Sequence, residues 1–156
     1  MGQLIGRGRS ANMKEVINSI RKVSIEVSKW FGYATAVVDG IEVDQSRAPQ
    51  NNSMCQFGQW YDKDEWNLSS FEEYAQIGHH HLKLHALFDE MMEIVNKEQK
   101  SSFLNKLAGA SSQMPKKYKK ILFRKYQDFK HESELLLSLL KMLQVKVDEM
   151  EQELAA

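Results

Sequence analysis

The sequence predicts an all-α fold, an antiparallel four-helix bundle with a short extra helix carrying Cys55 inserted between the first two long helices. Only two prolines, Pro49 and Pro115, interrupt the 156 residues. The chain is rich in Leu, Lys and Glu and has eight methionines, all residue types that favour helices. Long stretches place apolar residues in alternating steps of three and four, the spacing of a packed helical seam. We therefore expect one domain over residues 1–156, with its core in residues 12–146.

The first helix is expected from about residue 12 to residue 38. Its apolar seam consists of Met13, Val16, Ile20, Val23, Val27, Trp30, Ala34 and Val37. Gly40, after Asp39, predicts the end of this helix, because glycine readily adopts the left-handed conformation that follows a helix end.

Residues 41–67 lose this periodicity, and Pro49, Asn51, Asn52 and Ser53 indicate a loop. Within this region, residues 55–61 (CQFGQWY) carry too much aromatic surface for a solvated linker. We expect them to form a short helix or turn that packs on the bundle.

The next long helix is expected to begin with a capping box, either Ser70 with Glu73 or Ser69 with Glu72, and to continue to about Lys97. A separate short helix over residues 102–107 and a break over residues 109–115 should follow. The last helix is expected from Lys116 to the end of the chain. Its seam consists of Leu122, Tyr126, Phe129, Ser133, Leu136, Leu140, Leu143, Val147 and Met150. Residues 141–154 could extend beyond the bundle and pair with a second copy, which predicts a homodimer.

Composition narrows the classes of function. The formal net charge is zero and the pI is near 7, which argues against binding to nucleic acid or anionic membranes by bulk electrostatics. No apolar stretch is long enough for a membrane span. Residues 1–9 lack the apolar run of a signal peptide, and the single cysteine excludes an intramolecular disulfide. We therefore expect a cytoplasmic protein.

His81 and His85 are the strongest chemical signal. They are four residues apart on a predicted helix, so their rings project from one face about one turn apart and could hold one metal ion. A polar, solvated face is the alternative, and His79 and His80 should point elsewhere and be exposed. Cys55 could add a thiolate, a preferred zinc ligand, or could simply be a buried structural cysteine.

The pattern Cys55-x-Phe57-Gly58-x-Trp60 followed by His81-xxx-His85 closely resembles the chemoreceptor zinc-binding (CZB) domain family. The resemblance covers about residues 14–144. It implies a four-helix-bundle-like fold that binds one Zn²⁺ through three histidines and one cysteine. It also implies a bacterial signalling role, in which the domain modulates an attached chemoreceptor or diguanylate cyclase.

One family ligand is missing from this chain. The family has a histidine on the first helix shortly before an aromatic that aligns with Trp30, and the matching position here is Val27, or Ser28 if the register shifts by one. Three matched ligands therefore remain, namely Cys55, His81 and His85. Water or Glu26 could complete the coordination, or less favourably His131, which lies off the apolar seam of the last helix. A degenerate site is a further possibility.

These observations predict a zinc or oxidant sensor in chemotaxis or related signalling that acts through a zinc thiolate on an output domain or partner protein. We expect no enzymatic activity, because no general base is recognisably placed for a zinc hydrolase. A structural helical-bundle adaptor with a degenerate site is the main alternative. A haemerythrin-like di-iron protein is less favoured, because the first helix has no histidine.

Overall fold

A computed structural model describes residues 9–44, 55–109 and 113–156 of the chain. Helices dominate these ranges: α1 (Arg9–Val38), α2 (Gln56–Lys63), the 3-10 helix η2 (Leu68–Ser70), α3 (Glu73–Leu107) and α4 (Lys116–Ala155). The described part of the chain has no strand. The predicted all-helical class is confirmed.

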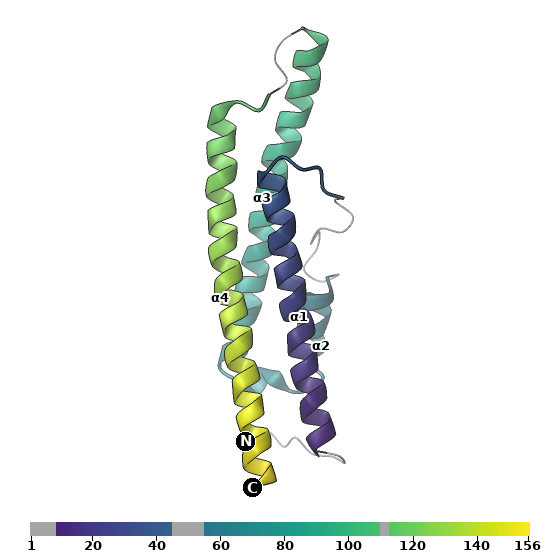
Figure 1. Ribbon diagram of the computed structural model, residues 1–156, viewed down its shortest axis with the longest axis vertical. Coiled ribbons are helices and arrows are strands. Elements are labelled where there is room, and N and C mark those ends of the chain that lie inside the picture. Colours follow the sequence, from purple (N-terminus) through teal and green to yellow (C-terminus); the bar gives the residue numbers. More distant parts are fainter. Residues whose placement is uncertain (1–8, 45–54, 110–112) are drawn as a thin grey trace.

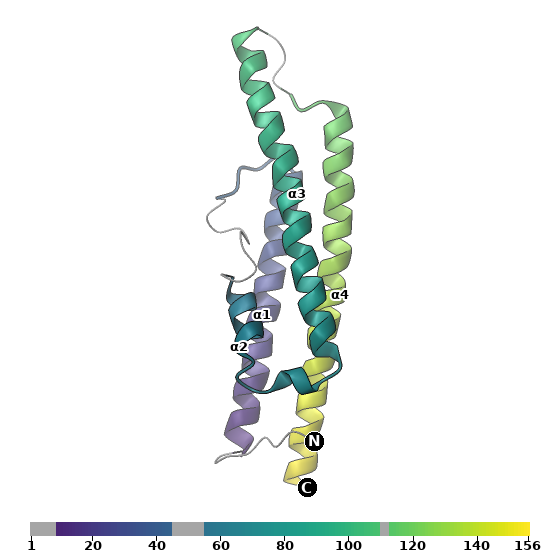
Figure 2. The ribbon, with the colours of Figure 1, turned by 180° about the vertical axis from the view of Figure 1, so that it is seen from behind.

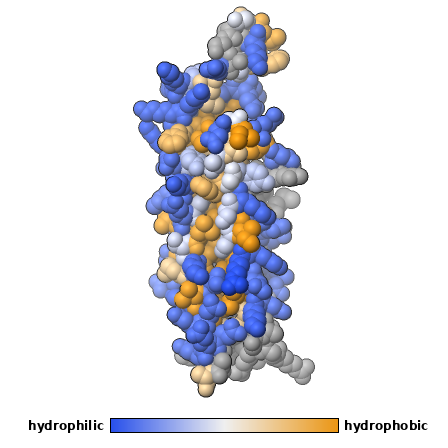
Figure 3. All heavy atoms as spheres, in the orientation of Figure 1, coloured by the Kyte–Doolittle hydropathy of each residue, from blue (hydrophilic) through white to orange (hydrophobic). Residues whose placement is uncertain are grey.

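The three long helices lie side by side in an elongated rod (Figures 1 and 2). Helices α1 and α3 run in the same direction along the rod, whereas α4 runs in the opposite direction. Helix α4 packs against both of them, and the short α2 packs on α1. Hydrophilic residues cover most of the face seen in Figure 3, with apolar residues between them along the long axis. This helix-on-helix packing confirms a bundle.

The apolar seams predicted for the first and last helices form the core. All eight seam residues of α1 are buried, from Met13 to Val37. Seven of the nine seam residues of α4 are also buried, and Tyr126 and Met150 pack against the core with part of their surface exposed. Each fully buried large apolar side chain contributes about 1.5–3 kcal/mol, so the seams hold the long helices together. Leu143 and Val147 are buried, so the last turns of α4 use much of their apolar surface inside the bundle.

The separate short helix expected over residues 102–107 is wrong, because α3 continues without a break from Glu73 to Leu107. The segment KEQKSS at residues 97–102 loses the apolar period but contains neither glycine nor proline, so nothing in it ends a helix. The period is lost because this end of α3 projects past the end of α1 (Figure 1). Phe103, Leu104 and Leu107 are accordingly exposed there.

The expected capping box at the start of α3 is also wrong. Ser70 Oγ donates to the carbonyl of Asn67 at 2.9 Å, and Ser69 Oγ donates to the Asp64 carboxylate. The residue before α3, Glu72, makes no side-chain cap. The serines instead stabilise the turn around η2, where Asp64 also accepts from the Leu68 amide at 2.6 Å.

The segments that follow α1 and α3 agree in part with the sequence predictions. Gly40 and Gly109 both have positive φ, at +74° and +71°, as residues that follow a helix end often do. Most of the predicted loop, with Pro49, Asn51, Asn52 and Ser53, lies outside the described residues. Within the described residues, no helix is both long enough and apolar enough to cross a membrane.

Candidate metal centre

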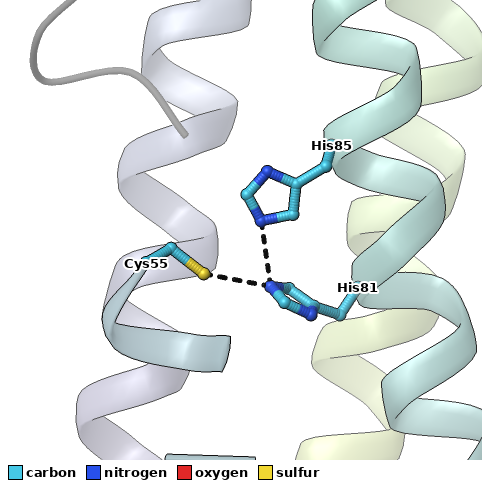
Figure 4. Close-up of side chains that lie close together, drawn as sticks. All are labelled: Cys55, His81 and His85. Carbon is cyan, nitrogen blue, oxygen red and sulfur yellow. Dashed lines mark hydrogen bonds between the residues drawn. The ribbon is translucent and has the colours of Figure 1, made fainter. Parts of the chain in front are cut away.

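Cys55, His81 and His85 converge on one point in the bundle (Figure 4). Cys55 Sγ lies 3.2 Å from His81 Nε2, and His81 Nε2 lies 3.0 Å from His85 Nε2. One potential ligand atom from each of the three residues lies within 4.8 Å of the others. The thiol comes from the start of α2 and both imidazoles come from α3, so the cluster joins two elements that are separate in the sequence.

Cys55 is the N-cap of α2. Its backbone is extended, with φ −71° and ψ 152°, and its Sγ accepts a hydrogen bond from the Gly58 amide at 3.1 Å. Burial raises the pKa of the Cys55 thiol, and the amide of Gly58 opposes this shift. A nearby bound cation is therefore the factor that would favour the thiolate at neutral pH.

His81 lies between aromatic rings and is buried. Its imidazole stacks on Phe57, with centroids 4.3 Å apart and planes at 16°, and more distantly on Trp30 at 5.7 Å. Burial, with a smaller contribution from His85, lowers the pKa of His81 to about 3. His81 is thus a neutral imidazole at physiological pH, the form in which histidine binds metals.

His85 lies one helical turn further along α3 and is also buried. Its ring is nearly perpendicular to that of His81, with centroids 4.7 Å apart and planes at 83°. The Trp30 ring of α1 packs on the His85 ring, with the two centroids 5.3 Å apart. Trp30 therefore contacts both histidines and fixes the side of the cluster that faces α1.

Contacts around α2 hold Cys55 in place. The Trp60 indole N–H donates to Ser19 Oγ on α1 at 3.1 Å, and the Tyr61 ring stacks on Tyr74 at 4.4 Å. The Tyr74 hydroxyl donates to the Tyr61 carbonyl at 2.5 Å. Gly78 leaves room for this arrangement, since a Cβ there would overlap the Tyr61 ring. Sequence reasoning missed Ser19, Tyr74 and Gly78, because their partners are distant in the chain.

The candidates for a fourth ligand lie outside this group. Val27 is fully buried on α1, as the seam predicted, and offers no donor atom. Glu26 forms an ion pair with Lys29 at 2.7 Å, yet its charge contributes to the raised pKa of Cys55, so it lies within electrostatic range. His131 is exposed on α4.

His80 differs from its expected exposure, whereas His79 is exposed as expected. His80 Nδ1 contacts the Glu132 carboxylate of α4 at 2.5 Å, and Lys83 Nζ contacts the same carboxylate at 2.9 Å. Glu132 is buried. This cluster ties α3 to α4.

The cluster can hold a metal ion. It offers one thiol and two imidazoles, at least one of them neutral, and both donor types bind borderline-soft divalent metals. No protein-family model, curated protein or solved structure matches the chain. The chemistry of the site therefore rests on its own geometry.

Proposed function

We propose that the chain is a zinc-binding sensor module, built as an antiparallel bundle with the Cys55 helix inserted between long helices. The observation that carries this proposal is the convergence of Cys55 Sγ with His81 Nε2 and His85 Nε2. Two imidazoles one turn apart and a thiol from another element form a set that structural packing alone does not require. This reading agrees with the resemblance of the sequence to CZB domains.

Zinc is the metal that best suits one sulfur and two imidazole ligands, since Zn²⁺ accepts mixed Cys and His sites in tetrahedral geometry. When bound, it would hold Cys55 as a thiolate. Water or Glu26 would complete the coordination. Of the two protein candidates, Glu26 and His131, we favour Glu26 because its charge already contributes to the raised pKa of Cys55.

Cys55 is the residue through which the site would respond. It is the N-cap of α2, whereas the other two ligands lie on α3, so any change at its sulfur alters the attachment of α2 to α3. A peroxide could transfer one oxygen atom to the thiolate, giving sulfenic acid and hydroxide. With no second cysteine in the sequence, an internal disulfide cannot follow.

Movement of α2 would then be the signal. Phe57, Trp60 and Tyr61 pack on α1 and α3, so releasing Cys55 would bias the packing of both long helices. We propose that a cytoplasmic output domain or a partner protein of bacterial signalling reads this change, and that the module works as a homodimer.

One observation favours the structural adaptor as the alternative. Cys55, His81 and His85 already lie within hydrogen-bonding distance of one another along the cluster, which would satisfy buried polar groups without a cation. An adaptor of this kind would have the same stability with and without chelator.

Metal analysis by mass spectrometry of the purified protein tests the proposal, with Cys55→Ser and His131→Ala as a matched pair. We expect about one zinc per chain in the wild type and in His131→Ala, and little in Cys55→Ser. Chelation should also lower the melting temperature of the wild type but not of Cys55→Ser. Wild-type protein that stays free of zinc in excess zinc would support the adaptor instead.

A further inference from the structure

The end of the rod formed by the last turns of α3 and the first turns of α4 exposes large apolar side chains. Here α3 projects past the end of α1 (Figure 1). Twelve large apolar side chains are exposed in the described part of the chain, and six of them lie at this end: Phe103, Leu104, Leu107, Tyr118, Ile121 and Phe123. We call these six residues the apolar tip. Apolar surface gathered in one exposed region is typical of an interaction site.

The same end of the rod is strongly basic. Residues 97–130 contain ten of the chain's 21 lysines and arginines but only two of its 21 acidic residues. Three of the ten pair with acids just outside this range, through Lys97, Lys125 and Lys130. The net charge of zero argues against electrostatic attraction by the chain as a whole, but it conceals one positive end.

Apolar and basic side chains are interleaved on both helices at this end. On α3, Lys100 lies three residues before Phe103 and four before Leu104, and residues at these spacings are neighbours on a helix surface. On α4, Lys119 lies four residues before Phe123. Figure 3 shows apolar residues beside hydrophilic ones near this end. Such a surface can place its apolar side chains in a membrane interface while the lysines stay among the headgroups.

We propose that this end of the rod docks on a membrane surface that contains anionic lipids. The apolar tip would enter the boundary between headgroups and acyl chains, and the lysines would lie against the headgroup phosphates. Attraction between a basic segment and an anionic leaflet extends over a Debye length, about 8 Å at physiological ionic strength, so the lysines of α4 contribute without entering the bilayer. The proposal goes beyond zinc sensing and is independent of it.

The composition of the tip favours lipid over the other occupants of a basic surface. Leu104, Leu107 and Ile121 are aliphatic and cannot stack on nucleic-acid bases, whereas they can enter a membrane interface. Nine of the ten basic residues are lysines, although arginine is the better residue for bidentate contacts to phosphate. A second copy docked tip to tip would bring two positive ends together, which like-charge repulsion opposes.

Co-sedimentation of the full chain with vesicles tests the proposal. Vesicles of equimolar phosphatidylglycerol and phosphatidylcholine are compared with vesicles of phosphatidylcholine alone. We expect binding to the anionic vesicles that is at least about tenfold tighter and that weakens as NaCl rises from about 50 to about 500 mM. Equal binding to both kinds of vesicle, or no binding to anionic vesicles at the lower salt concentration, would overturn the proposal.

Matched triple variants test the basic residues. Neutralising three exposed lysines of α4, in Lys116→Gln/Lys117→Gln/Lys120→Gln, should weaken binding to the anionic vesicles at least about tenfold. The same loss of charge at exposed lysines elsewhere, in Lys14→Gln/Lys22→Gln/Lys141→Gln, should weaken it much less. Equal losses in the two triple variants would contradict a site at this end of the rod.

Matched double variants test the apolar tip. Phe103→Ser/Leu107→Ser should also weaken vesicle binding at least about tenfold, because two side chains no longer enter the interface. Leu82→Ser/Val145→Ser, at side chains that are also exposed, should bind like the wild type. Unchanged binding by the tip variant would contradict insertion of these side chains.

Quenching by brominated lipid gives a second readout of contact with the acyl chains. Vesicles of the same anionic composition with brominated acyl chains should quench the emission of Phe103→Trp more than that of the wild type, whose Trp30 is buried. In Leu82→Trp the quenching should match the wild type. Quenching of Phe103→Trp no greater than that of the wild type would overturn the proposal.

The remaining controls separate other occupants and the zinc site from the membrane. Single-stranded DNA that matches the phosphatidylglycerol in charge should leave the chain on the vesicles, and Phe103→Ser/Leu107→Ser should sediment like the wild type without lipid. Release by DNA would favour nucleic acid, and a changed association state would favour a second copy; either result would overturn the proposal. Cys55→Ser should bind vesicles like the wild type, so a failure of zinc binding leaves this test intact.

Discussion

The imidazole of His81 and the ring of Phe57 stack with their centroids 4.3 Å apart, although His81 belongs to α3 and Phe57 to α2. Phe57 is fully buried, and its ring also lies near the Trp30 ring of α1, with the two centroids 6.0 Å apart. The same side chain therefore anchors α2 in the core and sets the plane of a potential metal ligand. Docking of α2 and the geometry of the site are coupled through this contact.

Replacing Phe57 with Leu should lower both the stability of the protein and its affinity for zinc. Leucine retains apolar volume but cannot stack, so we expect metal-free protein to lose about 1 kcal/mol of unfolding free energy from the lost ring contacts. Zinc affinity should fall as well, because the His81 ring is no longer held in one plane. Urea denaturation and competition titration with a zinc chelator measure the two effects. Phe123→Leu, at a ring that is 54% exposed, is the control and should change neither.

Gly78→Ala and Gly32→Ala form a matched pair on two long helices. A Cβ at Gly78 would overlap the Tyr61 ring, whereas a Cβ at Gly32 meets nothing within 4 Å. We expect Gly78→Ala to displace Tyr61 from Tyr74 and to destabilise the protein by about 1–3 kcal/mol, as overpacking does. Gly32→Ala should stabilise it by roughly 0.5–1 kcal/mol, because alanine favours helix. Equal effects of the two substitutions on urea unfolding would show that Tyr61 does not pack over Gly78.

The ion pair of Glu73 and Lys146 predicts how stability depends on pH. Lys146 Nζ lies 2.5 Å from Glu73 Oε1, and this contact lowers the pKa of Glu73 from its ordinary value of 4.5. Above pH 4.5 the ion pair makes its full contribution to the free energy of unfolding. Below that pH the unfolded chain takes up the proton first, so the contribution is lost as the pH falls through the lowered pKa.

Lys146→Met should therefore be less stable than the wild type at pH 7, and this difference should shrink as the pH falls below 4.5 and through the lowered pKa of Glu73. Urea unfolding at several pH values measures it. Lys97→Met, which breaks an exposed pair with Glu93, should have little effect at any pH. A stability difference for Lys146→Met that does not change with pH would contradict the role of the ion pair.

The sequence predicted the core well because long amphipathic helices carry their own signal. The spacing from Met13 to Val37 alone identified the buried face of α1. The sequence failed at places that depend on distant contacts. Ser70 could cap a helix by its position, but the Asp64 turn draws it into a different set of hydrogen bonds. The continuity of α3 past Lys97 was hidden because the helix leaves the bundle there and no longer needs an apolar face.

Residue type and spacing indicated Cys55, His81 and His85, and the structure brings the three together. The supporting contacts could not be predicted in this way. Ser19 and Trp60 are 41 residues apart, and nothing in the local sequence of Ser19 indicates an indole partner. His80 was expected to be exposed because it is off the face of His81, yet Glu132 of α4 pairs with it from the other side.

The most direct measurement of the central claim is zinc K-edge X-ray absorption spectroscopy of the zinc-loaded protein. The proposal predicts one sulfur ligand at about 2.3 Å and at least two imidazole nitrogens at about 2.0–2.1 Å, with the sulfur signal absent in Cys55→Ser. A spectrum without sulfur in the wild type, or one that Cys55→Ser leaves unchanged, would show that zinc does not bind between α2 and α3 and would contradict the proposed sensor.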